Sequence, residues 1–83
     1  MNEISATVMG EIIGVQGHKD STKDVAYAYV KNGMKIFNLA GRRATLHEGL
    51  INKMASLDCR ITIYERDRGP ALLQVWAYSV NLK

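Results

Sequence analysis

Two tyrosines and a lysine are the side chains in this chain whose types and spacing best suit chemistry. Tyr27, Tyr29 and Lys31 follow one another at intervals of two residues, so in an extended strand all three point the same way. Aromatic rings stack on planar bases, and cations neutralise phosphates. The pattern therefore indicates a surface that binds bases and phosphates.

Acid–base catalysis has few candidate groups. Two pairs are conceivable, His18 with Asp20 and His47 with Glu48. A nuclease-like or toxin-like mechanism would need the fold to bring the two histidines together, and their spacing gives no support for that. The sequence also lacks a glycine-rich phosphate loop with its Lys and Ser or Thr. We therefore expect a protein that is not an enzyme.

Metal binding and redox chemistry depend here on one residue, because Cys59 is the single cysteine. One cysteine cannot form a disulfide within the chain, and without a second Cys or a nearby His cluster it matches no zinc pattern. We expect Cys59 to be a small buried apolar side chain. We also expect no metal ion and no small-molecule cofactor.

Composition and charge indicate a single small globular domain over residues 1–83. The chain is 47% hydrophobic and carries a net charge of +3, from 11 Lys and Arg against 8 Asp and Glu. It contains no apolar run near the roughly 18 residues that a membrane helix needs, and its N-terminus does not resemble a signal peptide. We expect a cytoplasmic protein without a membrane partner. The balance is only mildly basic, so the placement of the charges matters more than their sum.

The stretch 24–41, DVAYAYVKNGMKIFNLAG, predicts a β-hairpin. Asn32-Gly33 tolerates the positive φ angles of a two-residue type I′ turn, and apolar residues alternate on both sides of it. A turn there sets the expected cross-strand pairs: Lys31 with Met34, Val30 with Lys35, Tyr29 with Ile36, Ala28 with Phe37, Tyr27 with Asn38, and Ala26 with Leu39.

These pairs separate two faces of the hairpin. The small-against-large face suits a tight barrel interior and carries Ala26, Ala28, Val30, Phe37 and Leu39. The other face, expected to point outward, carries Tyr27, Tyr29, Lys31, Met34, Ile36 and Asn38. If Phe37 is in the core, Phe37→Ala should cost about 3 to 5 kcal/mol of stability.

The remaining segments predict three more strands and one helix. Residues 6–16 form a first strand interrupted by two glycines, 18–24 a polar loop, 59–66 and 71–82 two further strands, and 67–70 the turn between them. Within 44–58, Leu46, Leu50, Met54 and Leu57 form one helical stripe. Thr45 and Glu48 add a capping box at its start.

The order strand, strand, strand, helix, strand, strand resembles the OB-fold, a five-stranded barrel with one helix between strands three and four. The glycine-interrupted first strand, the helix of about three turns and the short chain match the pattern over nearly the whole sequence. An SH3-like barrel or another small α+β sheet is the alternative. Within the OB-fold class the chain looks most like the small single-stranded-nucleic-acid-binding proteins of bacteria, phages and plasmids.

The resemblance implies a binding groove across the second and third strands, bordered by two loops. The strands would supply Tyr27, Tyr29, Lys31, Ile36 and Asn38, and the loops Lys19, Lys23, Arg66 and Arg68. Arg60 and Tyr64 share a side of the next strand and extend that surface. We expect a protein that binds single-stranded DNA or RNA with low sequence specificity, as a homodimer or larger homo-oligomer.

A different reading of the same aromatics remains open. Tyr27 and Tyr29 are also what a core or a dimer contact contains, and Trp76 and Tyr78 suit core, interface or binding surface equally. The alternative function is therefore a small barrel that serves as a protein–protein interaction or oligomerisation module of a larger complex. The sequence does not distinguish DNA from RNA.

Overall fold

The computed structural model describes residues 2–83. This part of the chain contains five β-strands and one short 3₁₀ turn. They are β1 (Asn2–Gly17), β2 (Ala26–Asn32), β3 (Lys35–Gly41), η1 (Glu48–Leu50), β4 (Met54–Tyr64) and β5 (Leu72–Leu82). The strands close a barrel in the order β1-β2-β3-β5-β4, in which only β3 and β5 are parallel. This five-stranded β-barrel confirms the predicted mainly β class and is consistent with an OB-like fold.

The first strand is long and bent, as its glycines predicted. Its first half pairs with β4, its second half pairs with β2, and the register with β2 shifts between Ile12 and Gly14. Such a bulge bends a strand sharply and carries it from one neighbour to the other. At Gly10, where φ is 157°, a Cβ would overlap the carbonyl of Lys31, so only glycine allows this close approach.

The hairpin forms where it was predicted, but its turn lies one residue further along. Asn32 pairs with Lys35, Tyr29 with Asn38 and Tyr27 with Ala40, so the predicted register is wrong by two residues. Asn32 stays in the strand because its side-chain amide donates a hydrogen bond of 2.8 Å to the Met9 carbonyl. Gly33 takes the positive φ instead. A shift of two residues preserves side-chain direction, so the predicted faces keep their sides.

The predicted helix within 44–58 is wrong. The structure has only the 3₁₀ turn there, its N-cap is His47 rather than Thr45, and no side chain caps it. Asn52 then takes a φ of 72°, which ends the turn, and β4 begins at Met54. Leu46 and Leu50 are buried as the helical stripe required, because Leu46 just before the turn and Leu50 at its end both pack into the barrel core. Met54, however, is 53% exposed, and the residues after it alternate as a strand.

The core lies inside the closed part of the barrel. Its fully buried side chains include Ile12, Val30, Leu39, Leu46, Leu57 and Cys59, so the predicted burial of Cys59 is confirmed. Phe37 was predicted to join them, but it is 38% exposed. Its side chain points inward beside Val30, but β3 meets β5 only at Ala40 and Gly41. No β5 residue therefore pairs with β3 at Phe37, and the expected cost of Phe37→Ala falls accordingly.

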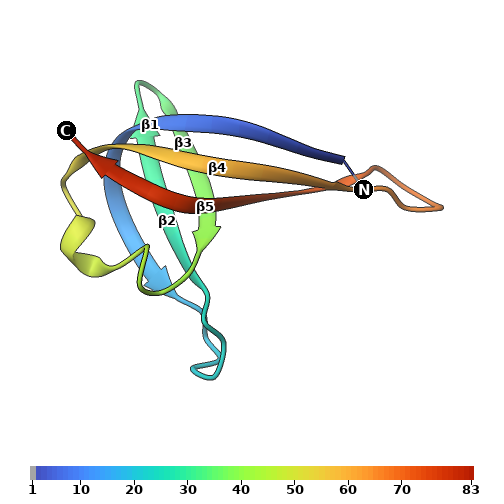
Figure 1. Ribbon diagram of the computed structural model, residues 1–83, viewed down its shortest axis with the longest axis horizontal. Helices are drawn as coiled ribbons and strands as arrows, with labels where there is room; N and C mark the ends of the chain where they lie inside the picture. Colours follow the sequence, from blue (N-terminus) through green and yellow to red (C-terminus); the bar gives the residue numbers. More distant parts are fainter. Residues whose placement is uncertain (1) are drawn as a thin grey trace.

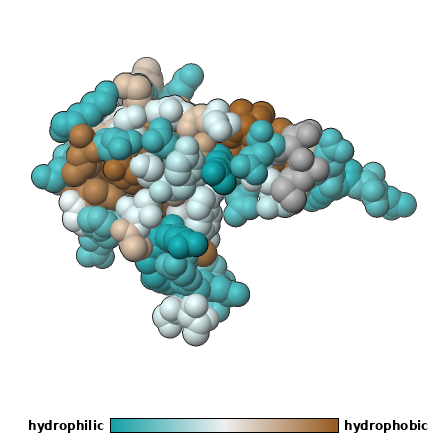
Figure 2. Space-filling model, in the orientation of Figure 1, coloured by the Kyte–Doolittle hydropathy of each residue, from teal (hydrophilic) through white to brown (hydrophobic). Residues whose placement is uncertain are grey.

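Three strands continue beyond the closed barrel. We call this part the extension: residues 2–7 of β1, 60–64 of β4 and 72–75 of β5, with β4 in the middle. It forms the long arm that points right in Figure 1 and ends in the β4–β5 loop. The face that continues the core is apolar and carries Ile4, Ile61, Ile63, Leu73 and Val75. The space-filling view shows apolar atoms at the base of this arm and hydrophilic ones toward its tip (Figure 2).

Candidate nucleic-acid interface

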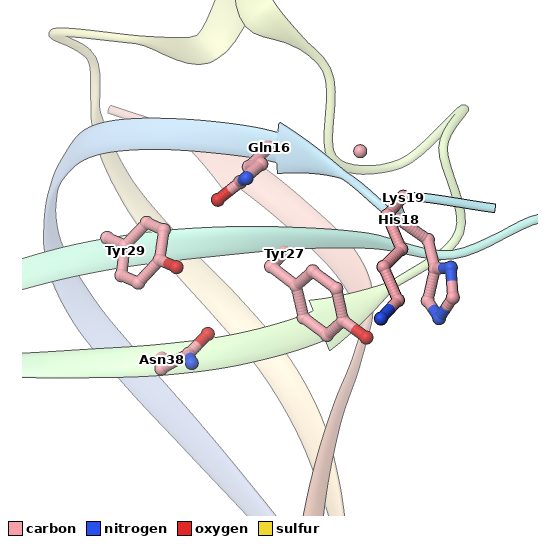
Figure 3. A pocket seen from close by; sticks show the side chains of 7 residues that line it. Gln16, His18, Lys19, Tyr27, Tyr29 and Asn38 are labelled. Atoms are coloured by element: carbon pink, nitrogen blue, oxygen red, sulfur yellow. The ribbon is translucent and has the colours of Figure 1, made fainter. Parts of the chain in front are cut away.

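A hollow of about 310 Å³ opens on the outer surface of β1, β2 and β3. Its lining consists of Gln16, Gly17, His18, Lys19, Tyr27, Tyr29 and Asn38. Figure 3 shows the two tyrosines side by side on β2, the amides of Gln16 and Asn38 on the strands to either side, and the two loop residues beyond Tyr27. The hollow therefore has an aromatic floor, polar walls and a cation at its edge.

The strand register assembles this floor. Gln16 lies opposite Tyr27, and Tyr29 lies between Gly14 and Asn38, so directly opposed residues point outward together. A Cβ at Gly14 would lie 3.5 Å from the Tyr29 ring, which shows that this ring lies alongside β1. The bulge in β1 is what turns Gln16 outward, because regular alternation from the buried Ile12 would have turned it inward.

His18 extends the aromatic floor beyond the sheet. Its ring stacks on Tyr27, with a centroid distance of 6.2 Å and an interplanar angle of 30°. The backbone N–H of Asp20 donates a hydrogen bond of 3.0 Å to His18 Nδ1. That bond fixes the ring orientation and uses Nδ1 as an acceptor, so a proton on the neutral ring is carried by Nε2.

The loop that carries His18 and Lys19 is held by Arg43. The guanidinium donates hydrogen bonds to three loop carbonyls, those of Lys23 at 2.8 Å, His18 at 2.9 Å and Asp20 at 3.3 Å. The backbone N–H of Arg43 also donates to Asp24 Oδ1 at 3.1 Å. A Cβ at Gly17 would overlap the Arg43 guanidinium, so glycine makes room for it. Arg43 is therefore a positioning residue for this side of the hollow.

Asp20 stabilises the same loop from inside. The Thr22 hydroxyl donates to Asp20 Oδ1 at 2.7 Å, and the Thr22 backbone N–H donates to the same oxygen at 3.0 Å. These bonds, with the nearby charges of His18 and Arg43, lower the pKa of Asp20 below its ordinary value of 3.8. The carboxylate is therefore charged at neutral pH, and its contribution to loop order is lost only as the pH falls through that lowered pKa.

A second hollow, of about 370 Å³, lies across β4 and β5. Its lining consists of Arg42, Thr45, Arg60, Trp76, Ala77 and Tyr78. The Arg60 guanidinium sits 5.1 Å from the centre of the Tyr78 ring, a cation–π contact. Arg60 Nε also lies 3.5 Å from Glu3 Oε1, an ion pair in which both side chains are mostly exposed. Trp76 and Tyr78 point outward on the same side, with the buried Ala77 between them.

The structure gathers some of the predicted site residues and leaves others apart. Lys19, Tyr27, Tyr29 and Asn38 meet in the first hollow. Lys31 and Ile36 lie opposite each other nearer the hairpin turn, and Lys23 lies in the loop that Arg43 holds. Arg60 borders the second hollow. Tyr64, Arg66 and Arg68 lie toward the far end of the extension, at a distance from the loop 18–25 in Figure 1.

Sequence reasoning missed three residues of the first hollow and the residue that positions its loop. Gln16 and Gly17 depend on the position of the bulge, and His18 was considered only as an acid–base group. Arg43 was not among the predicted site residues, and it reaches back about 20 residues along the chain. No local pattern signals such a contact. The basic pair Arg42-Arg43 was the only available signal.

No protein-family model, curated protein or solved structure matches the chain. Within residues 2–83, no group of three His, Cys, Asp or Glu side chains is placed to hold a metal ion. The same residues include no helix with the length and apolar character to cross a membrane. The functional reading therefore rests on the two hollows and the surface between them.

Proposed function

We propose that this protein binds single-stranded DNA or RNA with little sequence preference, and that the first hollow is the centre of its binding surface. The observation that best supports this proposal is the aromatic floor of Tyr27 and Tyr29, which the stacked ring of His18 extends and Lys19 borders. An aromatic platform beside a cation suits a nucleobase attached to its phosphate.

In this proposal bases stack on Tyr27 and Tyr29, each for about 1 to 3 kcal/mol. The amides of Gln16 and Asn38 can each donate and accept a hydrogen bond, so they accommodate any base edge and favour low specificity. Lys19, Lys23 and Lys31 neutralise phosphates, and Ile36 adds apolar surface on the turn side. A strand long enough to reach the tip of the extension would also meet Tyr64, Arg66 and Arg68.

The proposal assigns no chemical step to the protein. His18 is the only His, Asp or Glu side chain that lines the first hollow, so it is the main candidate there for a general acid or base. Its Nδ1 already accepts the Asp20 N–H, and its ring stacks on Tyr27, which is the arrangement of a platform.

Fluorescence anisotropy with a labelled single-stranded oligonucleotide, titrated over a range of salt concentrations, tests the proposal. We expect the affinity to fall as salt rises, with a logarithmic slope of about −0.7 for each phosphate neutralised. Affinity no better than millimolar at low salt, or affinity independent of salt, would exclude nucleic-acid binding. A parallel titration with RNA of the same sequence compares the two ligand classes.

Variants of the tyrosines locate the site. Tyr27→Ala and Tyr29→Ala should each weaken binding by about 1 to 3 kcal/mol with little change in melting temperature, because both rings are only half-buried on the outer face. Tyr27→Phe and Tyr29→Phe are the matched controls, since they keep the ring and remove the hydroxyl. Equal affinity for the Ala and Phe variants would remove the stacking role.

A second candidate function, self-association, is favoured by the extension. Its apolar face leaves Ile4 50% and Leu73 65% exposed, and β1 has no strand partner on its β2 side over residues 2–7. An exposed apolar sheet with an unpaired edge is a pairing site, and antiparallel pairing of β1 with a second copy is self-complementary.

Light scattering coupled to size exclusion tests the self-association. We expect a dimer or larger homo-oligomer, and Leu73→Glu should shift it toward the monomer because the charge would be buried in the interface. The matched control is Leu72→Glu, which adds the same charge to the opposite face of the extension. A wild-type monomer at high concentration would exclude self-association.

A further inference from the structure

One row of outward side chains crosses all five strands of the barrel. The strand pairings place Gln16 opposite Tyr27, Tyr27 opposite Ala40, Ala40 opposite Trp76, Trp76 opposite Arg60, and Arg60 opposite Ser5. Directly opposed residues point to the same side of a sheet, so this row is a continuous line on the outer surface. It joins the first hollow to the second.

We propose that a bound single strand follows this row from the first hollow into the second, where Trp76 and Tyr78 stack further bases and Arg42 and Arg60 contact its phosphates. The inference rests on the proposed function and adds a direction to it. From the first hollow the strand runs across the β-strands, over the junction of β3 and β5.

The small side chain of Ala40 leaves room for a nucleic-acid strand to pass between the two hollows. Ala40 is the only member of the row between the two aromatic residues Tyr27 and Trp76, and its side chain is a single methyl group. A larger side chain at this position would stand between the hollows. Tyr27 and Trp76 are two strand spacings apart, about 10 Å. That distance corresponds to about three nucleotides at the stacked spacing of about 3.4 Å, and to fewer in an extended strand.

The second hollow has the same chemistry as the first. Trp76 is half-buried and Tyr78 is 49% exposed, so each is anchored on one side and open on the other. Arg60 already contacts the Tyr78 ring, and Arg42 adds a second exposed cation. The opposing charge at this hollow is Glu3, which is paired with Arg60 across an exposed and therefore weak contact. A phosphate can replace that carboxylate.

Trp76 is the only tryptophan, so its fluorescence reports the second hollow directly. The experiment titrates the full chain with deoxythymidine oligonucleotides of about two and about ten nucleotides, each monitored by anisotropy of a label and by Trp76 emission. We expect the longer oligonucleotide to quench Trp76 strongly. The shorter one should bind in the first hollow and quench it little.

Variants separate the two hollows. Trp76→Ala should weaken binding of the longer oligonucleotide by about 5- to 150-fold, the equivalent of one stacked base, and leave the shorter one unaffected. Tyr27→Ala should weaken both. Trp76→Phe keeps an aromatic ring and should keep most of the affinity, which guards against a folding defect in Trp76→Ala. The double variant Arg42→Ala, Arg60→Ala should reduce the salt slope of the longer oligonucleotide by about 1.4.

Glu3 supplies an independent readout. Glu3→Gln releases Arg60 and should strengthen binding of the longer oligonucleotide more than Glu65→Gln does. The latter makes the same charge change in the β4–β5 loop, beyond the end of β4.

The outcomes distinguish this inference from the proposed function. If the longer oligonucleotide binds without quenching Trp76, and both the Trp76→Ala and the double arginine variants bind it as the wild type does, the path across Ala40 is wrong and the first hollow stands alone. If neither oligonucleotide binds, the proposed function is lost and the path with it. Quenching by the longer oligonucleotide, with selective loss in Trp76→Ala, supports the path.

Discussion

Three strands, β1, β4 and β5, run through both the closed barrel and the extension, yet their apolar faces are buried very differently in the two regions. On β4, Leu57 is fully buried inside the barrel, while Ile61, four residues further along the same face, is only partly covered. On β5, Ala77 is fully buried and Leu73 is 65% exposed. The alternation of side chains is unbroken from Leu57 to Ile61 on β4 and from Ala77 to Leu73 on β5. What changes is whether other strands close over them.

The barrel is closed by β2 and β3. These two strands pair only with the parts of β1 and β5 that lie outside the extension. β3 pairs with β5 at two positions and β2 pairs with β1 only from Glu11 onward, so nothing covers the outer halves. Apolar alternation therefore predicts direction, and the topology decides burial.

Two leucines give the sharpest test of the contrast. Leu57→Ala removes a fully buried side chain and should lower the free energy of unfolding by about 2 to 5 kcal/mol. Leu73→Ala makes the same change on the exposed face of the extension and should cost less than about 1 kcal/mol. Urea unfolding followed by circular dichroism measures both. Equal losses would mean that the extension is covered in solution, as a second copy of the chain would do.

Phe37 lies at the boundary between the two regions, inward-facing but open to solvent. Phe37→Ala should cost about 1 to 2 kcal/mol, below the 3 to 5 kcal/mol typical of a buried Phe, because part of its surface is already exposed. Its cross-strand partner Val30 is fully buried and gives the comparison within the same pair. If Phe37→Ala cost as much as a core deletion, the open end of the barrel would have to be closed in solution.

The loop beside the closed barrel and the loop at the end of the extension differ in how many hydrogen bonds from an arginine side chain hold them. The loop 18–25 is held by three guanidinium bonds from Arg43, whereas the loop 65–71 has one comparable bond, from Arg66 Nε to the Pro70 carbonyl at 2.9 Å. Arg43→Ala should remove the hydrogen-exchange protection of 18–25 and lower the free energy of unfolding by about 1 kcal/mol. Arg43→Lys, which keeps the charge without the fork, should behave similarly. Unchanged protection in both would show that Asp20 and Thr22 order the loop alone.

Cys59 provides the smallest and most specific probe. Burial, and then the charge of Asp58, raise the pKa of the Cys59 thiol above its ordinary 9.0. A raised pKa means that the unfolded chain loses the proton first, so the stability is intact below about pH 9 and falls as the pH rises above it. The difference in unfolding free energy between wild type and Cys59→Ala, measured by urea unfolding, should be constant near neutral pH and should change only at the alkaline end, where the wild type loses stability.

Reagent access gives a second measure of the same contrast. The thiol of Cys59 should react with a thiol reagent only as fast as the barrel unfolds, since it is fully buried. In a Ser5→Cys variant, a thiol on the exposed outer face of the extension should react at once. Rapid reaction of both thiols would mean that the barrel opens locally near Cys59.

The sequence correctly predicted which face of a strand each side chain points to, because this depends only on alternation along the strand. It failed where burial depends on which other strands close over a residue. The faces of the hairpin were predicted correctly, because an error of two residues in the register leaves side-chain direction unchanged. The helix was wrong because Leu46, Leu50 and Leu57 fit both a helical stripe and a turn followed by a strand. Phe37 was misplaced because burial at its position depends on β5, a strand more than thirty residues away.

The candidate site divides in the same way. Tyr27, Tyr29 and Asn38 were predicted from local alternation, and Lys19 from the loop that the OB-fold resemblance places beside the groove; the structure brings the four together. Gln16 required the bulge. The row through Ala40 to Trp76 required the parallel pairing of β3 with β5, which no local pattern indicates.

The bulge in β1 also bears on how the chain tolerates changes in length. Ile13 is the extra residue between the two registers and is partly exposed. A chain one residue shorter at this point would still turn Ile12 inward and Gln16 outward, because the deletion restores regular alternation. It would lose the bend that carries β1 from β4 to β2. A one-residue deletion here therefore alters the curvature of the strand and leaves the facing of its side chains intact.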